Sequence, residues 1–144
     1  MRTYAQDEVR IREQVLHKNV VGKEFIFKAK GNSETRLRYL VCIKTKKGET
    51  LKFLNSIYLF GLYEDAKRAT CQLLIYDRRN RYLGNYYVGG VWYLPDRLEK
   101  AKLIFLPYKD CDQKTTISFE NGIPKQIYIL CKGKEGDVFT FSGN

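Results

Sequence analysis

One stretch, residues 71–93, constrains the fold of this chain more than any other. Its two apolar runs, 71–76 and 82–88, are separated by the polar sequence DRRNR, which is the pattern of a strand, a turn and a returning strand. A pair of glycines then frees the backbone before Trp92 and Tyr93. The stretch therefore predicts a hairpin that ends in an aromatic corner.

The same alternation of apolar and polar residues recurs along most of the chain. Further strands are expected over residues 23–30, 36–45, 50–54, 57–62, 115–119, 126–131 and 138–141. Residues 97–106 fit a strand or a helix equally well. Short strands at turn spacings of about a dozen residues are typical of all-β domains. We therefore predict an antiparallel β-sandwich or a closed barrel of about eight or nine strands.

The first 22 residues do not share this pattern. Acidic residues near the start are followed by apolar positions, which favours a short helix beginning near Asp7. We therefore expect an N-terminal extension, residues 1–22, packed on a single β domain, residues 23–144. The length of 144 residues agrees with one domain, because a chain of that size buries ~68–70% of the surface that it exposes when unfolded.

The charge balance is compatible with acidic partners, but an ordinary hydrated surface is the favoured interpretation. The net charge is +10, from 26 Lys and Arg against 16 Asp and Glu, although the cations are spread along the chain as on an ordinary hydrated surface. No run approaches the ~20 apolar residues of a membrane helix, so we expect a soluble protein without a transmembrane segment. The small residues Thr3 and Ala5 match the tail of a cleaved signal peptide, which would place the protein outside the cytoplasm.

Two of the four cysteines, Cys111 and Cys131, are candidates for a disulfide. If Asn121 and Gly122 form a two-residue hairpin loop, counting outward places Cys131 opposite Asp112. One bulge in that ladder would bring the two sulfur atoms within bonding reach. The other two cysteines lie in apolar strand patterns, where a buried thiol behaves as a small hydrophobic side chain.

The chain lacks the motifs of catalysis and of cofactor binding. Its only histidine, His17, lies in the predicted extension, so no base is placed to activate a nucleophile held by the core. With one histidine and no C-x-x-C spacing, a metal site would need ligands from distant strands. The carboxylate pairs Glu64-Asp65 and Asp110-x-Asp112 are loop neighbours, which cannot face each other across a cleft. We therefore expect no catalytic residue, metal or cofactor, and favour a non-enzymatic protein.

Two features of the sequence indicate binding, and the first is aromatic. Four rings flank the glycine bend: Tyr86, Tyr87, Trp92 and Tyr93. Stiff amphipathic rings offer contact area at low entropic cost, which suits the recognition of a protein or a glycan. Because Tyr86 and Tyr87 are adjacent on a strand, they must point to opposite faces. For the rings taken by themselves, the favoured interpretation is that they only close one end of the fold.

The second feature is basic. Six cations occupy two predicted turns: Lys44, Lys46, Lys47, Arg78, Arg79 and Arg81. If both turns lie at the same end of the fold, they form a cationic rim for phosphates, with Tyr76 or Tyr82 available for stacking. Charged turns also simply keep hairpins hydrated, and no RNA-binding consensus is present. Our leading hypothesis is a non-enzymatic module that binds a protein or glycan, and the alternative is a basic β-barrel that binds single-stranded nucleic acid.

Overall fold

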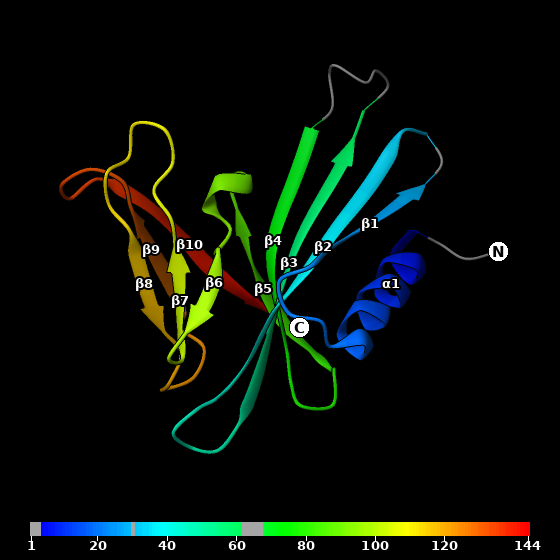
Figure 1. Ribbon diagram of the computed structural model, residues 1–144, viewed down its shortest axis with the longest axis horizontal. Helices are drawn as coiled ribbons and strands as arrows, with labels where there is room; N and C mark the ends of the chain where they lie inside the picture. The colour runs from blue at the N-terminus through cyan, green and yellow to red at the C-terminus, as the bar shows by residue number, and fades with distance from the viewer. Residues whose placement is uncertain (1–3, 30, 62–67) are drawn as a thin grey trace.

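The computed structural model describes residues 4–29, 31–61 and 68–144, with the side chains of the helix described from Asp7 onward (Figure 1). This part of the chain forms α1 (Tyr4–Lys18), β1 (Glu24–Ala29), β2 (Ser33–Lys44), β3 (Thr50–Phe60), β4 (Arg68–Tyr76), β5 (Tyr82–Val88), the 3₁₀ helix η2 (Val91–Tyr93), β6 (Arg97–Glu99), β7 (Lys102–Phe105), β8 (Thr115–Ser118), β9 (Gln126–Leu130) and β10 (Gly136–Gly143). The prediction of a mostly β chain is confirmed, and so is the central hairpin, which is β4 and β5.

The strands form two antiparallel sheets in a sandwich-like arrangement. Seven strands pair in the order β1-β2-β3-β4-β5-β10-β9, and β6-β7-β8 form the second sheet. The expectation of a closed barrel is wrong, because β1 and β9 end the larger sheet and do not pair with each other. The second sheet lies beside β9 instead (Figure 1), where the Leu130 N–H donates to Thr115 Oγ1 at 2.9 Å.

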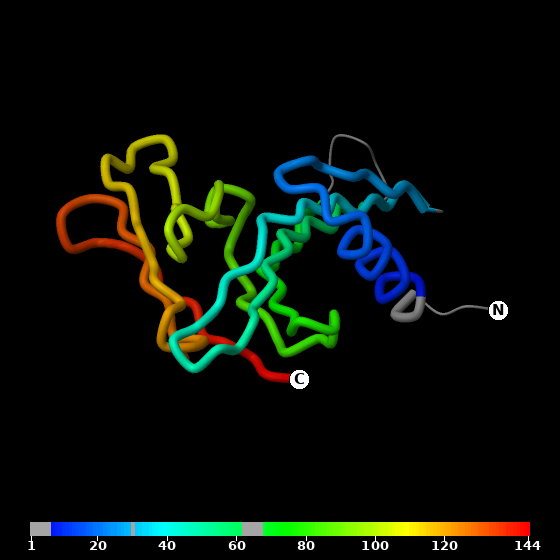
Figure 2. The backbone as a smooth tube through the Cα atoms, turned by 60° about the horizontal axis from the view of Figure 1, so that its bottom comes forward, coloured from blue at the N-terminus to red at the C-terminus, as the bar shows by residue number. Residues whose placement is uncertain are grey.

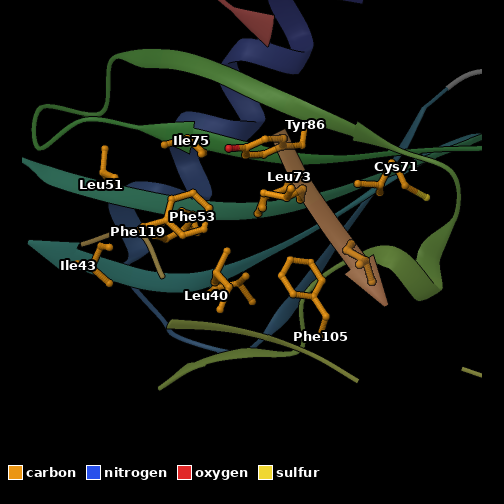
Figure 3. Close-up of a cluster of buried hydrophobic side chains, with 14 residues drawn as sticks. Leu40, Ile43, Leu51, Phe53, Cys71, Leu73, Ile75, Tyr86, Phe105 and Phe119 are labelled. Atoms are coloured by element: carbon orange, nitrogen blue, oxygen red, sulfur yellow. The ribbon is translucent and has the colours of Figure 1, made fainter. Parts of the chain in front are cut away.

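The two faces of the larger sheet are covered by different layers. On one face, α1 packs Ile11, Val15 and Leu16 against Leu37, Tyr39, Leu54, Leu74 and Tyr76. On the other face, the second sheet covers a larger core, and Figure 3 shows its members Leu40, Phe53, Leu73, Tyr86, Phe105 and Phe119. The backbone trace in Figure 2 shows α1 and the second sheet on opposite sides of the long strands.

A buried polar contact fixes the helix to the sheet. Thr35 Oγ1 donates a hydrogen bond to Glu8 Oε1 at 2.7 Å, and Arg12 pairs with Glu8 one turn along the helix at 3.5 Å. Glu8 is buried, so its carboxylate depends on these partners in place of water.

In the described part of the chain, no helix is long and apolar enough to cross a membrane.

A β-bulge corrects the predicted faces of β2. Strict alternation predicts that Cys42 is buried on the same face as Leu40. The register shifts between Tyr39 and Val41, and Val41 has a φ of 147°. The shift brings Ile43 onto the core face beside Leu40 and leaves Cys42 exposed.

Residues 97–106 form a hairpin, which resolves the ambiguity of the sequence. Glu99 pairs with Lys102, so Lys100 and Ala101 are the two residues of the turn. Both have positive φ, 49° and 64°, as the favoured two-residue hairpin turns of type I′ require. Neither residue is Gly, Asn or Asp, so the local sequence carries no turn signal.

Cys111 and Cys131 are joined by a disulfide, with their Cα atoms 4.3 Å apart. The Asp112 N–H donates to the Cys131 carbonyl oxygen at 3.0 Å, so Cys131 lies beside Asp112 as the counting argument places it. The argument assumed that β8 and β9 form one hairpin, whereas these strands belong to different sheets. The bond closes a loop of 20 residues, and such a loop stabilises a fold by roughly 3 kcal/mol.

The cysteines give a simple test of this arrangement. We expect one reactive thiol in the folded protein, two after unfolding, and four after unfolding with a reductant. Cys42 is exposed, whereas burial hides Cys71 and raises its pKa to about 11. A chromogenic thiol assay measures all three values. Four thiols after unfolding without reductant would contradict the disulfide.

The turn between β6 and β7 allows a prediction of stability. Replacing Lys100→Asn and Ala101→Gly together should raise the free energy of unfolding by about 1 kcal/mol, because Asn and Gly adopt positive φ at lower steric cost. Denaturant unfolding measures the change. As a control, Ala69→Gly at an exposed position of β4 should lower stability. A loss of stability in the turn variant would show that these dihedral angles are wrong.

Candidate binding groove

The floor of the groove is formed by paired residues on β1, β2 and β3. Arg38 lies opposite Glu24 on β1 and opposite Asn55 on β3. Directly paired residues of antiparallel strands project from the same face. Asn55 is itself paired with Leu73, which belongs to the larger core. The polar floor is therefore the continuation of the core face beyond the region that the second sheet covers.

The opposite wall comes from η2 and from the segments that follow it. Trp92, Pro95 and Asp96 line one part of the wall, and residues 106–108 line another. Together with the floor they enclose about 370 Å³. This volume lies in the range of about 300–1,000 Å³ that is usual for small-ligand sites. The space is therefore large enough to hold one unit of a ligand.

Trp92 presents an exposed and well-supported aromatic surface. It is 42% exposed and stacks on Tyr108, with 4.9 Å between ring centroids and an interplanar angle of 11°. A Cβ atom at Gly90 would lie 2.7 Å from the indole ring, so the ring position requires a glycine there. Stacking and the absence of a side chain at Gly90 together hold the indole at the edge of the groove.

Hydrogen bonds connect the floor to the wall. Arg38 Nη2 donates to the carbonyl oxygens of Pro95 at 3.1 Å and of Asp96 at 2.6 Å. Asn55 Nδ2 donates to the same Pro95 oxygen at 2.9 Å. Asn55 is only 5% exposed, and its Oδ1 atom has no hydrogen-bond partner among the described residues. The guanidinium of Arg38 is thus fixed by backbone groups and not by a carboxylate.

The charged residues that line the groove are two cations and two acids, so their charges cancel. Arg36 pairs with Glu34 at 2.5 Å, and Asp96 pairs with Arg97 at 2.7 Å. Arg38 and Glu24 line the groove without an ion pair to any residue that the structure describes. The groove therefore offers one fixed cationic donor and one carboxylate acceptor, with no net charge.

The four aromatic residues singled out in the sequence occupy different environments. Tyr86 is a core residue, because it is fully buried and its hydroxyl donates to the Pro124 carbonyl oxygen. Tyr87 is 58% exposed, but it points to the opposite face of β5. Tyr93 is half-buried, and the hydrogen bond from its hydroxyl to Asp137 raises its pKa. Of these four aromatic residues, only Trp92 lines the groove.

The two basic turns do lie at the same end of the fold (Figure 1). Four of the six expected cations line a shared hollow of about 510 Å³: Lys44, Arg78, Arg79 and Arg81. Glu49 and Asp77 also line it. Lys46 and Lys47 are exposed on the same turn, outside the lining. We call this feature the basic hollow.

One acid in the basic hollow is already committed to the turn. Desolvation acts to raise the pKa of Asp77, but hydrogen bonds from the backbone N–H groups of Arg81 and Arg79 and from the Arg81 side chain lower it overall. The rings proposed for stacking are not free there. Tyr76 is buried, and desolvation raises its pKa to about 12. Its ring packs on the half-buried Tyr82, with 5.5 Å between the ring centroids.

The remaining sequence candidates do not converge. His17 is exposed on α1, and Asp110 and Asp112 are exposed in the loop before β8. Glu64 and Asp65 lie outside the described residues. Within the described ranges, no group of three His, Cys, Asp or Glu side chains is placed to hold a metal ion.

Several groove residues were missed by sequence reasoning. Arg36 and Arg38 alternate on one strand face, which was a usable signal for a polar patch. Asn55 was interpreted as a break between two strands, whereas it is buried within β3. Tyr108 follows a proline in an apparent loop and gave no signal.

Comparisons with protein families, with curated proteins and with solved structures found no match.

Proposed function

We propose that this protein is a non-enzymatic interaction module that binds a protein or glycan partner in the groove beside Trp92. The observation that carries the proposal is an exposed indole, stacked on Tyr108 and facing a polar floor that Arg38 and Asn55 tie to the wall. Aromatic rings combined with a few fixed polar groups are the usual composition of recognition sites.

The rigidity of the groove supports this proposal. Binding loses free energy when side chains must be ordered at the same time. Here stacking holds the indole, and two carbonyl oxygens hold the guanidinium of Arg38 before any partner arrives. The disulfide between Cys111 and Cys131 supports a location outside the cytoplasm, where such bonds persist.

A second candidate function is binding of single-stranded nucleic acid at the basic hollow. The convergence of four cations from two turns favours it. The burial of Tyr76 weighs against it, because base stacking supplies much of the affinity of such proteins. The larger sheet is also open, so a barrel-like binding face is replaced by two hairpin tips.

The first test addresses Trp92. Printed arrays first identify a glycan or peptide that the full chain binds. This ligand should bind the Trp92→Ala variant roughly 30-fold more weakly, since a central aromatic anchor contributes about 2 kcal/mol or more. Gly90→Ala should also weaken binding, because the new Cβ displaces the indole. Tyr87→Ala removes an exposed ring from another face and is the matched control. Equal binding by Trp92→Ala would contradict the proposal.

The second test addresses the basic hollow. Affinity for a single-stranded oligonucleotide should fall steeply with salt, and Arg78→Gln with Arg79→Gln should reduce the slope of log K against log[salt] by ~0.7 for each phosphate that these side chains neutralise. Lys125→Gln with Lys132→Gln removes the same charge from exposed sites elsewhere. Fluorescence anisotropy of a labelled oligonucleotide measures the affinity and its dependence on salt for both double variants. Absence of binding at low salt would remove this candidate.

A further inference from the structure

We propose that the ligand of the groove is a neutral glycan, with one sugar ring on Trp92 and its hydroxyl groups bound by Arg38 and Glu24. The inference rests on the proposed binding function and deepens it by choosing among partners. Three properties of the groove lead to it: the balance of its charges, the pairing of its donor with its acceptor, and its position on the face of the sheet.

The balance of charges in the groove disfavours a ligand that carries a net charge of its own. Arg36 is paired with Glu34, and Asp96 is paired with Arg97, which also binds Glu99; this leaves Arg38 beside Glu24. A polyanion that approached Arg38 would also meet the carboxylate of Glu24 and would gain little. The cations Lys44, Arg78 and Arg79 lie in the basic hollow instead. A neutral ligand suits the groove better.

The donor and the acceptor come from directly paired residues, which places a cation and a carboxylate side by side in the groove. Glu24 and Arg38 are directly opposite on neighbouring strands, so their Cβ atoms are about 4.5–5.5 Å apart. A hydroxyl group both donates and accepts hydrogen bonds. In the contacts that we assign, one sugar hydroxyl donates to the Glu24 carboxylate and another accepts from the Arg38 guanidinium. The apolar face of the ring is left to cover Trp92, which lines the same groove.

The position of the groove disfavours an extended peptide. Peptides that add to sheets gain affinity from backbone hydrogen bonds along a free strand edge. The floor lies across the face of β1, β2 and β3, and the backbone groups of β2 are bonded to neighbours on both sides. The outer edge of β1 is free because β1 ends the larger sheet, but the groove opens over the face of the sheet and is lined by side chains. Polyhydroxylated rings use such side chains without needing a strand edge.

The experiment uses the single tryptophan of the chain as its reporter. Emission of Trp92 in the full chain is followed during titration with four probe classes: neutral oligosaccharides of glucose, xylose and mannose, oligogalacturonate, an oligothymidylate and an extended proline-rich peptide. Each titration is run at low and at high salt. We expect a neutral oligosaccharide to shift the emission, with a Kd that changes less than about twofold with salt because no ion pairs form.

Variants then test the proposed contacts by calorimetry. Glu24→Ala and Arg38→Gln should each weaken binding of that oligosaccharide roughly tenfold or more, as expected for hydrogen bonds to charged groups. Arg38 also holds the wall, so its variant is checked by thermal unfolding. Glu24 forms no ion pair within the described residues and keeps the test clear if Arg38→Gln fails to fold. Glu13→Ala removes an exposed acid from α1, which covers the opposite face of the sheet, and this variant should bind as the unmodified chain does.

The outcomes separate the two levels of the proposal. If only the peptide or oligogalacturonate shifts Trp92, the groove binds a partner and the neutral-glycan inference is wrong. If a neutral oligosaccharide binds but Glu24→Ala and Arg38→Gln bind equally well, the assigned contacts are wrong and the inference falls with them. If no probe changes the emission or releases heat, both the inference and the groove function are overturned.

Discussion

The burial of both faces of strands β2 to β4 is the constraint on which the rest of the structure depends. Leu73 and Leu74 are adjacent on β4, point to opposite faces and are both fully buried. A sheet of this kind needs two covering layers. The chain supplies α1 for one face, where Leu74 lies, and the second sheet for the other, where Leu73 lies.

The candidate groove is a direct result of where the second layer ends. Tyr86, Leu73, Asn55 and Arg38 form one row of paired residues across four strands. Under the second sheet the row is apolar, and beyond it the row becomes polar. Trp92 lies at this boundary because η2 carries the chain from β5 to the second sheet. Core and groove are thus two parts of one sheet face, and the floor of the groove is built on paired strands.

The sequence could predict features that depend on local patterning. Alternation identified most strands and the central hairpin, and acidic residues near Asp7 indicated the helix. The sequence could not predict the bulge at Val41 or the turn at Lys100 and Ala101, because no glycine marks either position. The groove escaped for a different reason. Its floor and wall come from segments far apart in the chain, and only the pairing of strands brings Arg38 to Trp92.

The net charge of +10 is not informative about the ligand of the groove. Arg38 and Lys44 lie on the same strand, β2, six residues apart, which corresponds to a separation of about 20 Å. Fixed charges are largely screened beyond a Debye length of about 8–10 Å at physiological salt. The cations of the basic hollow therefore act little on a ligand beside Trp92. In our proposal the selectivity of the groove therefore comes from its own residues, with Arg38 as the donor and Glu24 as the acceptor.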